Sequence, residues 1–226
     1  MKWTFVIHQK LKVAVLLGVV MGAVVMFNII LQKNISNINN SVNSIYQDRL
    51  IPATDIFYLS ENMHQRQSII EQFLYRNGAK VEELKALLHR HDQKMFSLID
   101  KYEKTYLVKE ESMSLKKFKQ SIADYSRLEN EVLALNDAGK DVDALRLYET
   151  AGRPSLESTI TQLTNLTTIQ STVGEKLVND TKGIVATSNF LSDLQMVLAI
   201  IIGLIITSLV VSSKIINQPQ AKFRWN

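Results

Sequence analysis

The sequence has no cysteine among its 226 residues, and it contains only 3 prolines and 8 glycines. Without cysteine, the chain can form neither a disulfide nor a thiolate metal site. Scarce proline and glycine disfavour folds that are rich in tight turns, such as β-sandwiches and β-barrels, and favour long helices. We therefore expect a helical chain with room for one domain plus its flanking segments.

The sequence also lacks the patterns that accompany common catalytic and metal chemistry. It contains no nucleophile–base pattern, no glycine-rich phosphate loop and no set of carboxylates with metal-ligand spacing. His89 and His91 are two residues apart, so on a helix they face different directions and do not form a metal site with His64. We expect no enzymatic activity, no cofactor and no metal.

Two long apolar runs occupy residues 13–31 and 194–211. The first contains one strongly polar residue, Asn28, and the second contains no charged residue. Because a helix of about 20 residues crosses the hydrocarbon core, we predict transmembrane helices at 13–32 and 194–211. The alternative for the first run is a cleaved signal peptide, but the run is long for one and no clear cleavage site follows it.

The charges predict how these helices are oriented. Six of the 26 Lys and Arg lie in the two short tails, at Lys2, Lys10, Lys12, Lys214, Lys222 and Arg224. The other 20 lie between the apolar runs with all 22 Asp and Glu, which leaves that region with a net charge of −2. Short basic tails stay in the cytoplasm, so residues 1–12 and 212–226 are expected inside and residues 33–193 outside. No basic patch argues for nucleic acid.

Between the runs, apolar residues recur every three to four positions, which predicts amphipathic helices packed side by side. The predicted helices are 33–77, 80–107, 112–136, a short helix at 142–149, and a last helix that starts near Pro154 and enters the second run. The turn signals between them are Asn77-Gly78, the polar stretch VKEES (108–112) and NDAGKD (136–141). Up-down-up-down order returns both apolar runs to one side of the membrane. We predict an all-α fold, an antiparallel four-helix bundle between two transmembrane helices.

Three further segments are informative: IYQDRLIPATDIFYLSEN (45–62), the connection at 135–163, and SSKIINQP (212–219). In this order they resemble the input half of bacterial methyl-accepting chemotaxis receptors, and SSKIINQP is similar to the start of a HAMP linker. The resemblance implies a sensor domain in the bacterial inner membrane that forms a homodimer. It also implies that the domain binds a small molecule, such as an organic acid or amino acid, and passes a helix displacement inward.

Receptors of this family continue into a HAMP linker and a long cytoplasmic signalling hairpin. Residues 212–226 are similar only to the beginning of that linker, so we expect a sensor module without its output domain. The chain could be a natural truncation, a fragment or a stand-alone partner of other receptors. Two alternative functions also remain open: an input domain for a histidine kinase or a cyclic-di-nucleotide cyclase, and a structural bundle that binds no ligand.

Two arginines fall where the first helix of the bundle needs apolar residues, Arg49 and Arg66. An arginine on such a stripe either extends to solvent or meets an anion. The resemblance implies a ligand pocket in the membrane-distal part of this helix, near the last helix. The candidate ligand-binding residues are Arg66, Gln67, Thr159 and Gln162. The alternative is that they are ordinary solvated positions, and we interpret Arg49, close to Pro52, as structural. We expect Arg66→Ala to weaken the binding of a carboxylate ligand by about 2 kcal/mol or more, with little change in the stability of the fold.

Overall fold

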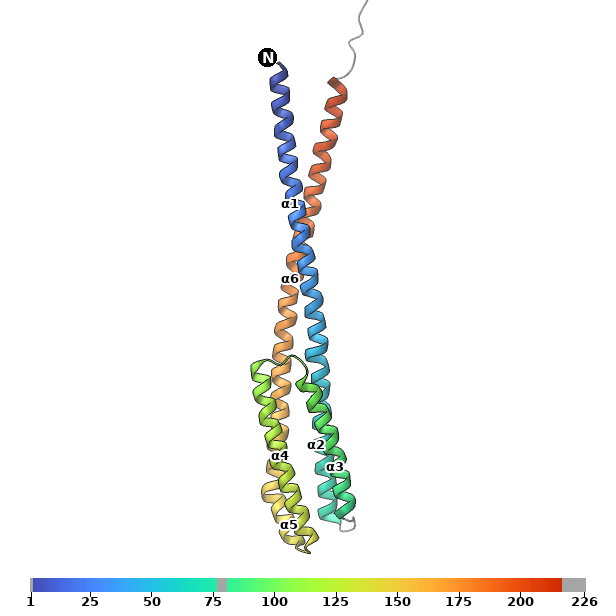
Figure 1. Ribbon diagram of the computed structural model, residues 1–226, viewed down its shortest axis with the longest axis vertical. Helices are drawn as coiled ribbons and strands as arrows, with labels where there is room; N and C mark the ends of the chain where they lie inside the picture. The colour runs from blue at the N-terminus through green and yellow to red at the C-terminus, as the bar shows by residue number, and fades with distance from the viewer. Residues whose placement is uncertain (1, 77–80, 217–226) are drawn as a thin grey trace, which may run out of the picture. The chain divides into compact units, whose positions relative to one another are not determined.

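The computed structural model describes residues 2–76 and 81–216, and all of its regular elements are helical (Figure 1). In chain order they are α1 (Lys2–Ser44), the π-helix η1 (Ile45–Leu50), α2 (Ile51–Arg76), α3 (Val81–Glu103), α4 (Lys109–Asp137), α5 (Asp141–Leu147), the π-helix η2 (Tyr148–Gly152) and α6 (Arg153–Ile216). The all-α prediction is confirmed. The predicted turn at Asn77-Gly78 and the linker residues from 217 onward lie outside the described residues.

The chain divides into two compact units, one of Ser41–Asn179 and one of Met1–Asn40 with Asp180–Asn226. The first unit is a four-helix bundle of α2, α3, α4 and the first part of α6. Cross-helix ion pairs fix the directions of its helices: Arg49–Glu111, Arg66–Glu129, Arg66–Asp92, Lys101–Asp55 and Arg153–Glu71. By these pairs α2 and α4 run in one direction and α3 in the other, and the hydrogen bond between Arg49 and Gln170 shows that α6 also runs in that other direction. This is the up-down-up-down order that the sequence predicts.

The interior of the bundle consists of two apolar clusters. The first is Ile56, Leu59, Met63, Met95, Ile99, Tyr102, Leu115, Phe118, Ile122, Tyr125, Leu156, Leu163 and Leu166. The second is Ile70, Phe73, Leu84, Leu88, Val132, Leu133, Ala144 and Tyr148. Most of these residues belong to the apolar stripes predicted from the sequence. Tyr106 was also predicted on the stripe of the helix at 80–107, but this prediction is wrong, because Tyr106 follows the end of α3 and is exposed.

The stripe predicted for the first helix starts with Ile35, Ile38, Val42 and Ile45, and only half of that start is correct. Ile38 and Ile45 are partly buried, but Ile35 and Val42 are exposed, whereas the preceding residues Asn34 and Ser41 are partly buried. The π-helix η1 follows directly, and a π-helical turn adds a residue to the helix. Sequence periodicity alone does not show such an insertion.

Each π-helix is followed by a proline at the second position of the next α-helix. The residue before each proline donates its amide hydrogen to a carbonyl five residues earlier, Ile51 to Tyr46 and Arg153 to Tyr148. Proline in a regular α-helix loses a hydrogen bond, and its ring collides with the carbonyl four residues back. The wider π turn lets the chain stay helical through Pro52, inside the predicted helix 33–77, and through Pro154, where the sequence predicts the start of a new helix.

The boundary between α3 and α4 corrects the prediction that VKEES breaks the chain. Helix α3 already ends at Glu103, and Lys109–Ser112 form the first turn of α4. Glu111 accepts a hydrogen bond from the backbone nitrogen of Val108 at 2.8 Å through Oε2, which satisfies one of the free donors at the helix start. Acidic residues also suit the positive end of the helix dipole. The acidic residues of VKEES therefore start a helix.

The NDAGKD turn forms as predicted. Gly139 has a φ of 72°, a left-handed conformation that glycine adopts without strain. The amide of Lys140 donates to the carbonyl of Leu135 at 2.9 Å and closes the end of α4. This turn lets α5 pack back against the second apolar cluster.

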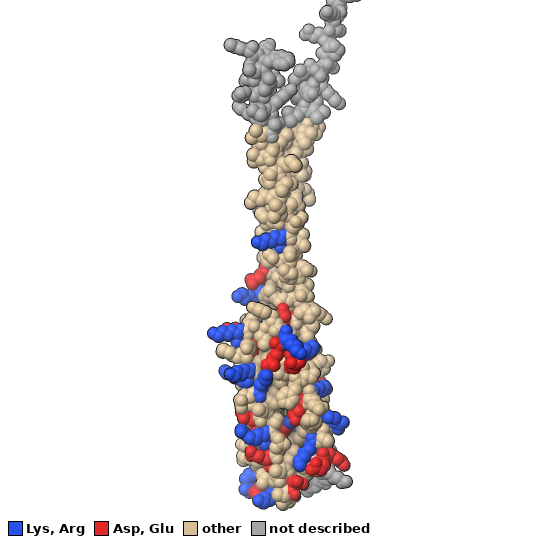
Figure 2. All heavy atoms as spheres, in the orientation of Figure 1, with Lys and Arg blue, Asp and Glu red and all other residues tan. Residues whose placement is uncertain are grey.

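The second unit contains the apolar parts of α1 and α6. The helical stretches Val15–Tyr75 and Asp141–Ser208 each contain an 18-residue window long and apolar enough to cross a membrane, with mean hydropathies of 2.3 and 2.2 and no burial inside the protein. Asn28 donates to the carbonyl of Val24 in its own helix, and Asn34 donates to the hydroxyl of Ser188 at 3.0 Å. Two long apolar helices are consistent with a two-pass membrane protein. In Figure 2 the charged side chains gather over the bundle helices.

Two phenylalanines provide a matched test of the bundle core. Phe118 is fully buried in the first cluster, whereas Phe96 on α3 is 63% exposed. Phe118→Ala should lower the free energy of unfolding by about 3–5 kcal/mol, because it removes buried apolar contacts and leaves a cavity. Phe96→Ala should change it by less than about 0.5 kcal/mol. Denaturant unfolding of the full chain in nanodiscs, followed by helical circular dichroism, measures both, and equal effects would contradict this core assignment.

Candidate functional site

Arg66 lies in the bundle interior, where the two apolar clusters meet. Its side chain is 2% exposed, with Met63 of the first cluster and Ile70 of the second one turn away on either side. Its Nε donates to Oε1 of Glu129 at 3.3 Å, and its Nη2 donates to the other oxygen of the same carboxylate. Its Nη1 donates to Oδ1 of Asp92 on α3. The guanidinium therefore joins α2, α3 and α4 in one charged layer.

Burial and pairing act against each other in this layer. Burial raises the pKa of Glu129 above its ordinary value, and the positive charge of Arg66 opposes that rise. Burial also works to lower the pKa of Arg66, but Glu129 and Asp92 together raise it above the ordinary value. The arginine therefore stays charged, and it depends on carboxylates from two other helices. Removing one partner of a buried pair leaves an uncompensated charge, which costs much more than removing an exposed charge.

The structure uses most of the predicted ligand-binding residues internally. The Gln67 amide donates to Glu71 at 3.0 Å, and the hydroxyl of the fully buried Thr159 donates to the carbonyl of Ser155 at 2.8 Å. Gln162 is only partly buried. A ligand carboxylate could reach Arg66 only by replacing a carboxylate of the chain, and Asp92, with its side chain 29% exposed, is the more accessible one.

Ligand binding at Arg66 thus stays a prediction, but two expectations about it need correction. Arg66 is neither a solvated position nor an arginine that extends to solvent, because its side chain is buried and paired. For the same reason, its removal is now expected to reduce stability strongly. The sequence contained a signal for this arrangement. Glu129 falls on the apolar stripe of α4, between Tyr125 and Val132, at a position where a carboxylate needs a partner.

Arg49 organises a second buried polar layer, around the connection between α3 and α4. Its Nη1 donates to Oε1 of Glu111 at 2.6 Å and to Oε1 of Gln170 at 3.3 Å, and its Nη2 donates to the carbonyl of Tyr106 at 3.1 Å. Gln170 in turn donates to the hydroxyl of Tyr102 at 3.0 Å. Burial raises the pKa of Tyr102 to about 12. These contacts support the structural interpretation of Arg49.

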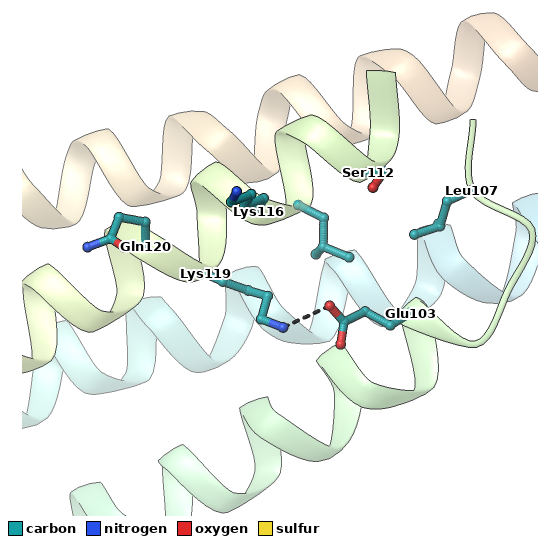
Figure 3. A pocket seen from close by; sticks show the side chains of 7 residues that line it. Glu103, Leu107, Ser112, Lys116, Lys119 and Gln120 are labelled. Carbon is teal, nitrogen blue, oxygen red and sulfur yellow. Dashed lines mark hydrogen bonds and ion pairs between the residues drawn. The ribbon is translucent and has the colours of Figure 1, made fainter. Parts of the chain in front are cut away.

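A cavity of about 420 Å³ opens beside this connection, between the end of α3 and the start of α4 (Figure 3). Its lining residues are Glu103, Leu107, Ser112, Leu115, Lys116, Lys119 and Gln120. Figure 3 shows Lys119 of α4 reaching across to Glu103 of α3, and the two charges are 2.8 Å apart. The sequence did not indicate this site, because the site depends on where α3 ends and α4 begins, and both predicted boundaries were misplaced.

The histidines contact other residues instead of one another. Nδ1 of His91 lies 3.0 Å from the Asn62 oxygen, and His89 contacts Gln93 at 3.1 Å. Burial, followed by the positive charge of Arg66, lowers the pKa of His91. Among the described residues, no group of three or more His, Cys, Asp and Glu side chains could hold a metal ion.

Comparison with known proteins gives one match. The model of a family described as a four helix bundle sensory module for signal transduction matches residues 4–185. That range covers both the bundle of four helices and the first apolar run. No curated protein and no solved structure matches the chain.

The Arg66 layer can be tested with a pair of variants of similar volume. Arg66→Met should destabilise the chain by about 3–5 kcal/mol, because Glu129 is left buried without a counter-ion. The double variant Arg66→Met/Glu129→Leu should recover at least half of that loss, since it removes both charges. Denaturant unfolding of the full chain in nanodiscs measures both values. Additive losses in the double variant would show that the two side chains do not depend on each other.

Proposed function

The chain belongs to the four-helix-bundle sensory modules for signal transduction, and from this premise we propose that it is the sensor of a transmembrane chemoreceptor. In this proposal the bundle binds a small molecule outside the cell, and helix displacement carries the signal across the membrane. The family match supports the role of a sensor. The output is chemotaxis, as the resemblance to methyl-accepting receptors implies.

The observation that carries this proposal is the helical continuity between the bundle and the apolar runs. Helix α6 includes both Leu156 of the bundle core and residues 194–211 of the second run. The chain is likewise helical from Lys2 through η1 to Arg76. A helix transmits an axial shift along its length because its backbone hydrogen bonds resist stretching. A displacement of either helix in the bundle can therefore reach the apolar segment of the same helix.

The charge distribution supports one orientation. The basic tails favour a cytoplasmic location for both ends, which puts the bundle on the outer side of a bacterial inner membrane. An organic acid or an amino acid is the proposed class of ligand. Arg66, Gln67, Thr159 and Gln162 remain the residues predicted from the resemblance, with Asp92 as the group that a ligand carboxylate would displace.

A hybrid receptor tests the proposed function. Residues 1–219 are joined to the HAMP linker and signalling hairpin of a characterised chemoreceptor, in cells that lack other receptors. At least one compound in a panel of amino acids and organic acids should change the activity of the associated kinase. Insertion of four glycines after Gly183 should abolish the response, because it interrupts α6, while ligand binding persists. A hybrid that inserts and activates the kinase, yet responds to no compound, would contradict a sensory role.

We also propose that the bundle pairs with a second copy through one face of η1 and α2. Tyr46, Leu50, Phe57 and Tyr75 are each more than half exposed. Helical spacing puts these side chains on one face, and exposed apolar stripes of this kind mark interaction surfaces. A second copy is the partner that the resemblance implies.

Thiol crosslinking tests this surface cleanly, because the chain has no cysteine. Phe57→Cys should form a disulfide-linked dimer on mild oxidation in membranes, since such a bond needs Cα atoms within about 7 Å of each other. Phe96→Cys, with a similarly exposed side chain on α3, is the control and should crosslink much more slowly. Equal rates at the two positions would indicate random collision instead of a specific dimer.

A further inference from the structure

We propose that the cavity between α3 and α4 binds a monocarboxylate with a short apolar body. This inference rests on the proposed sensory function and names the site and the class of its ligand. The cavity volume of about 420 Å³ falls in the range of small-molecule sites. It is separate from the Arg66 layer, and none of its lining residues was predicted to bind a ligand.

The charges around the cavity favour a single negative charge. Lys119 pairs with Glu103, so these two charges cancel. Lys116 also lines the cavity, and it forms no ion pair with any described residue. The lining therefore carries a net charge of +1. An ammonium group donates three hydrogen bonds and suits a carboxylate.

The rest of the lining favours an apolar body next to that carboxylate. Leu115, which is 2% exposed, and Leu107 form the apolar part of the wall. Ser112 and Gln120 add neutral polar groups at the same site. A second cavity of about 360 Å³, lined by Met113, Lys116, Lys117 and Gln120, shares Lys116 and Gln120 with the first. Because Lys116 lines the same cavity as Leu107 and Leu115, it can meet the carboxylate of a ligand whose apolar part lies against the leucines.

The position of the cavity connects it to the helix that leads to the first apolar run. Leu107 belongs to the segment that η1 holds by two hydrogen bonds. The amide of Tyr106 donates to Asp48 at 3.0 Å, and the carbonyl of Tyr106 accepts from Arg49 at 3.1 Å. A ligand that contacts Leu107 would push or pull on this segment, and through it on η1. Binding at this site can thus reach the helices without any change in the Arg66 layer.

A single-thiol protection experiment on the full chain in zwitterionic nanodiscs tests the site. Ser112→Cys provides the only thiol, and its rate of reaction with a neutral maleimide is measured in hexanoate. Small ligands of this size commonly bind with a dissociation constant of about 1 mM, so about 10 mM hexanoate should slow the reaction at least fivefold. Thr161→Cys, exposed on α6 and outside the cavity, should react at an unchanged rate.

Matched ligands and variants separate the charge from the apolar body. Hexanamide has nearly the same shape as hexanoate without its charge, and acetate has the charge without the body, so neither should protect Ser112→Cys. In the Ser112→Cys background, Lys116→Gln should weaken protection by hexanoate about tenfold, whereas Lys94→Gln, an exposed lysine elsewhere, should not. Glu103→Gln should strengthen the protection by hexanoate, because it makes the net charge of the cavity lining more positive.

Each outcome decides for or against the site. The proposed site is supported if hexanoate protects Ser112→Cys, if Lys116→Gln weakens this protection, and if Lys94→Gln leaves it unchanged. Absent protection, equal protection by hexanamide, or equal slowing at Thr161→Cys overturns it. The hybrid receptor provides the separate answer on function. If the hybrid responds to some compound while Ser112→Cys is never protected, the sensor proposal stands and this site is wrong.

Discussion

The buried pair between Arg66 and Glu129 is the interaction on which the alignment of the bundle depends. Apolar side chains pack almost as well after a small slide of one helix past another, so leucine and phenylalanine layers tolerate errors of alignment. A guanidinium between two apolar clusters does not, because any slide of α2 past α4 would move it away from Glu129 and against the apolar neighbours of Glu129, Tyr125 or Val132. The pair costs desolvation energy, and in return it selects one alignment of α2, α3 and α4.

Arg49 forms a second buried layer of this kind, roughly 25 Å from Arg66 along the helix, beside the connection between α3 and α4. Here the guanidinium also holds the segment between α3 and α4, through the carbonyl of Tyr106. Glu111 is used twice, as the partner of Arg49 and as the cap of α4. The start of α4 and the position of η1 are therefore set together, and α2 and α4 are tied to each other at two levels.

Sequence periodicity predicts much of this fold, because every turn of a packed helix needs apolar residues on its buried face, and this requirement repeats along the sequence. It also put Arg49 and Arg66 on the core face. It did not identify their partners, since Asp92 and Glu111 lie on segments that look like ordinary polar surface. The π-helices were missed because one added residue changes the phase without changing composition. The cavity at Lys116 could not be predicted, since it depends on where α3 ends and on the side-chain positions of two helices.

The buried ion pairs are distributed unequally among the four helices, and this determines which helix can shift most easily along its axis. Helices α2, α3 and α4 share the buried Arg66 layer, and sliding any of them would separate buried charges. Helix α6 meets the core through Leu156, Leu163 and Leu166. Among the described residues of α6, Gln170 is the one that contacts Arg49, through its neutral amide. The ion pair between α6 and Glu71 is partly exposed and correspondingly weak. A small axial shift therefore costs least for α6, the helix that also contains the second apolar run.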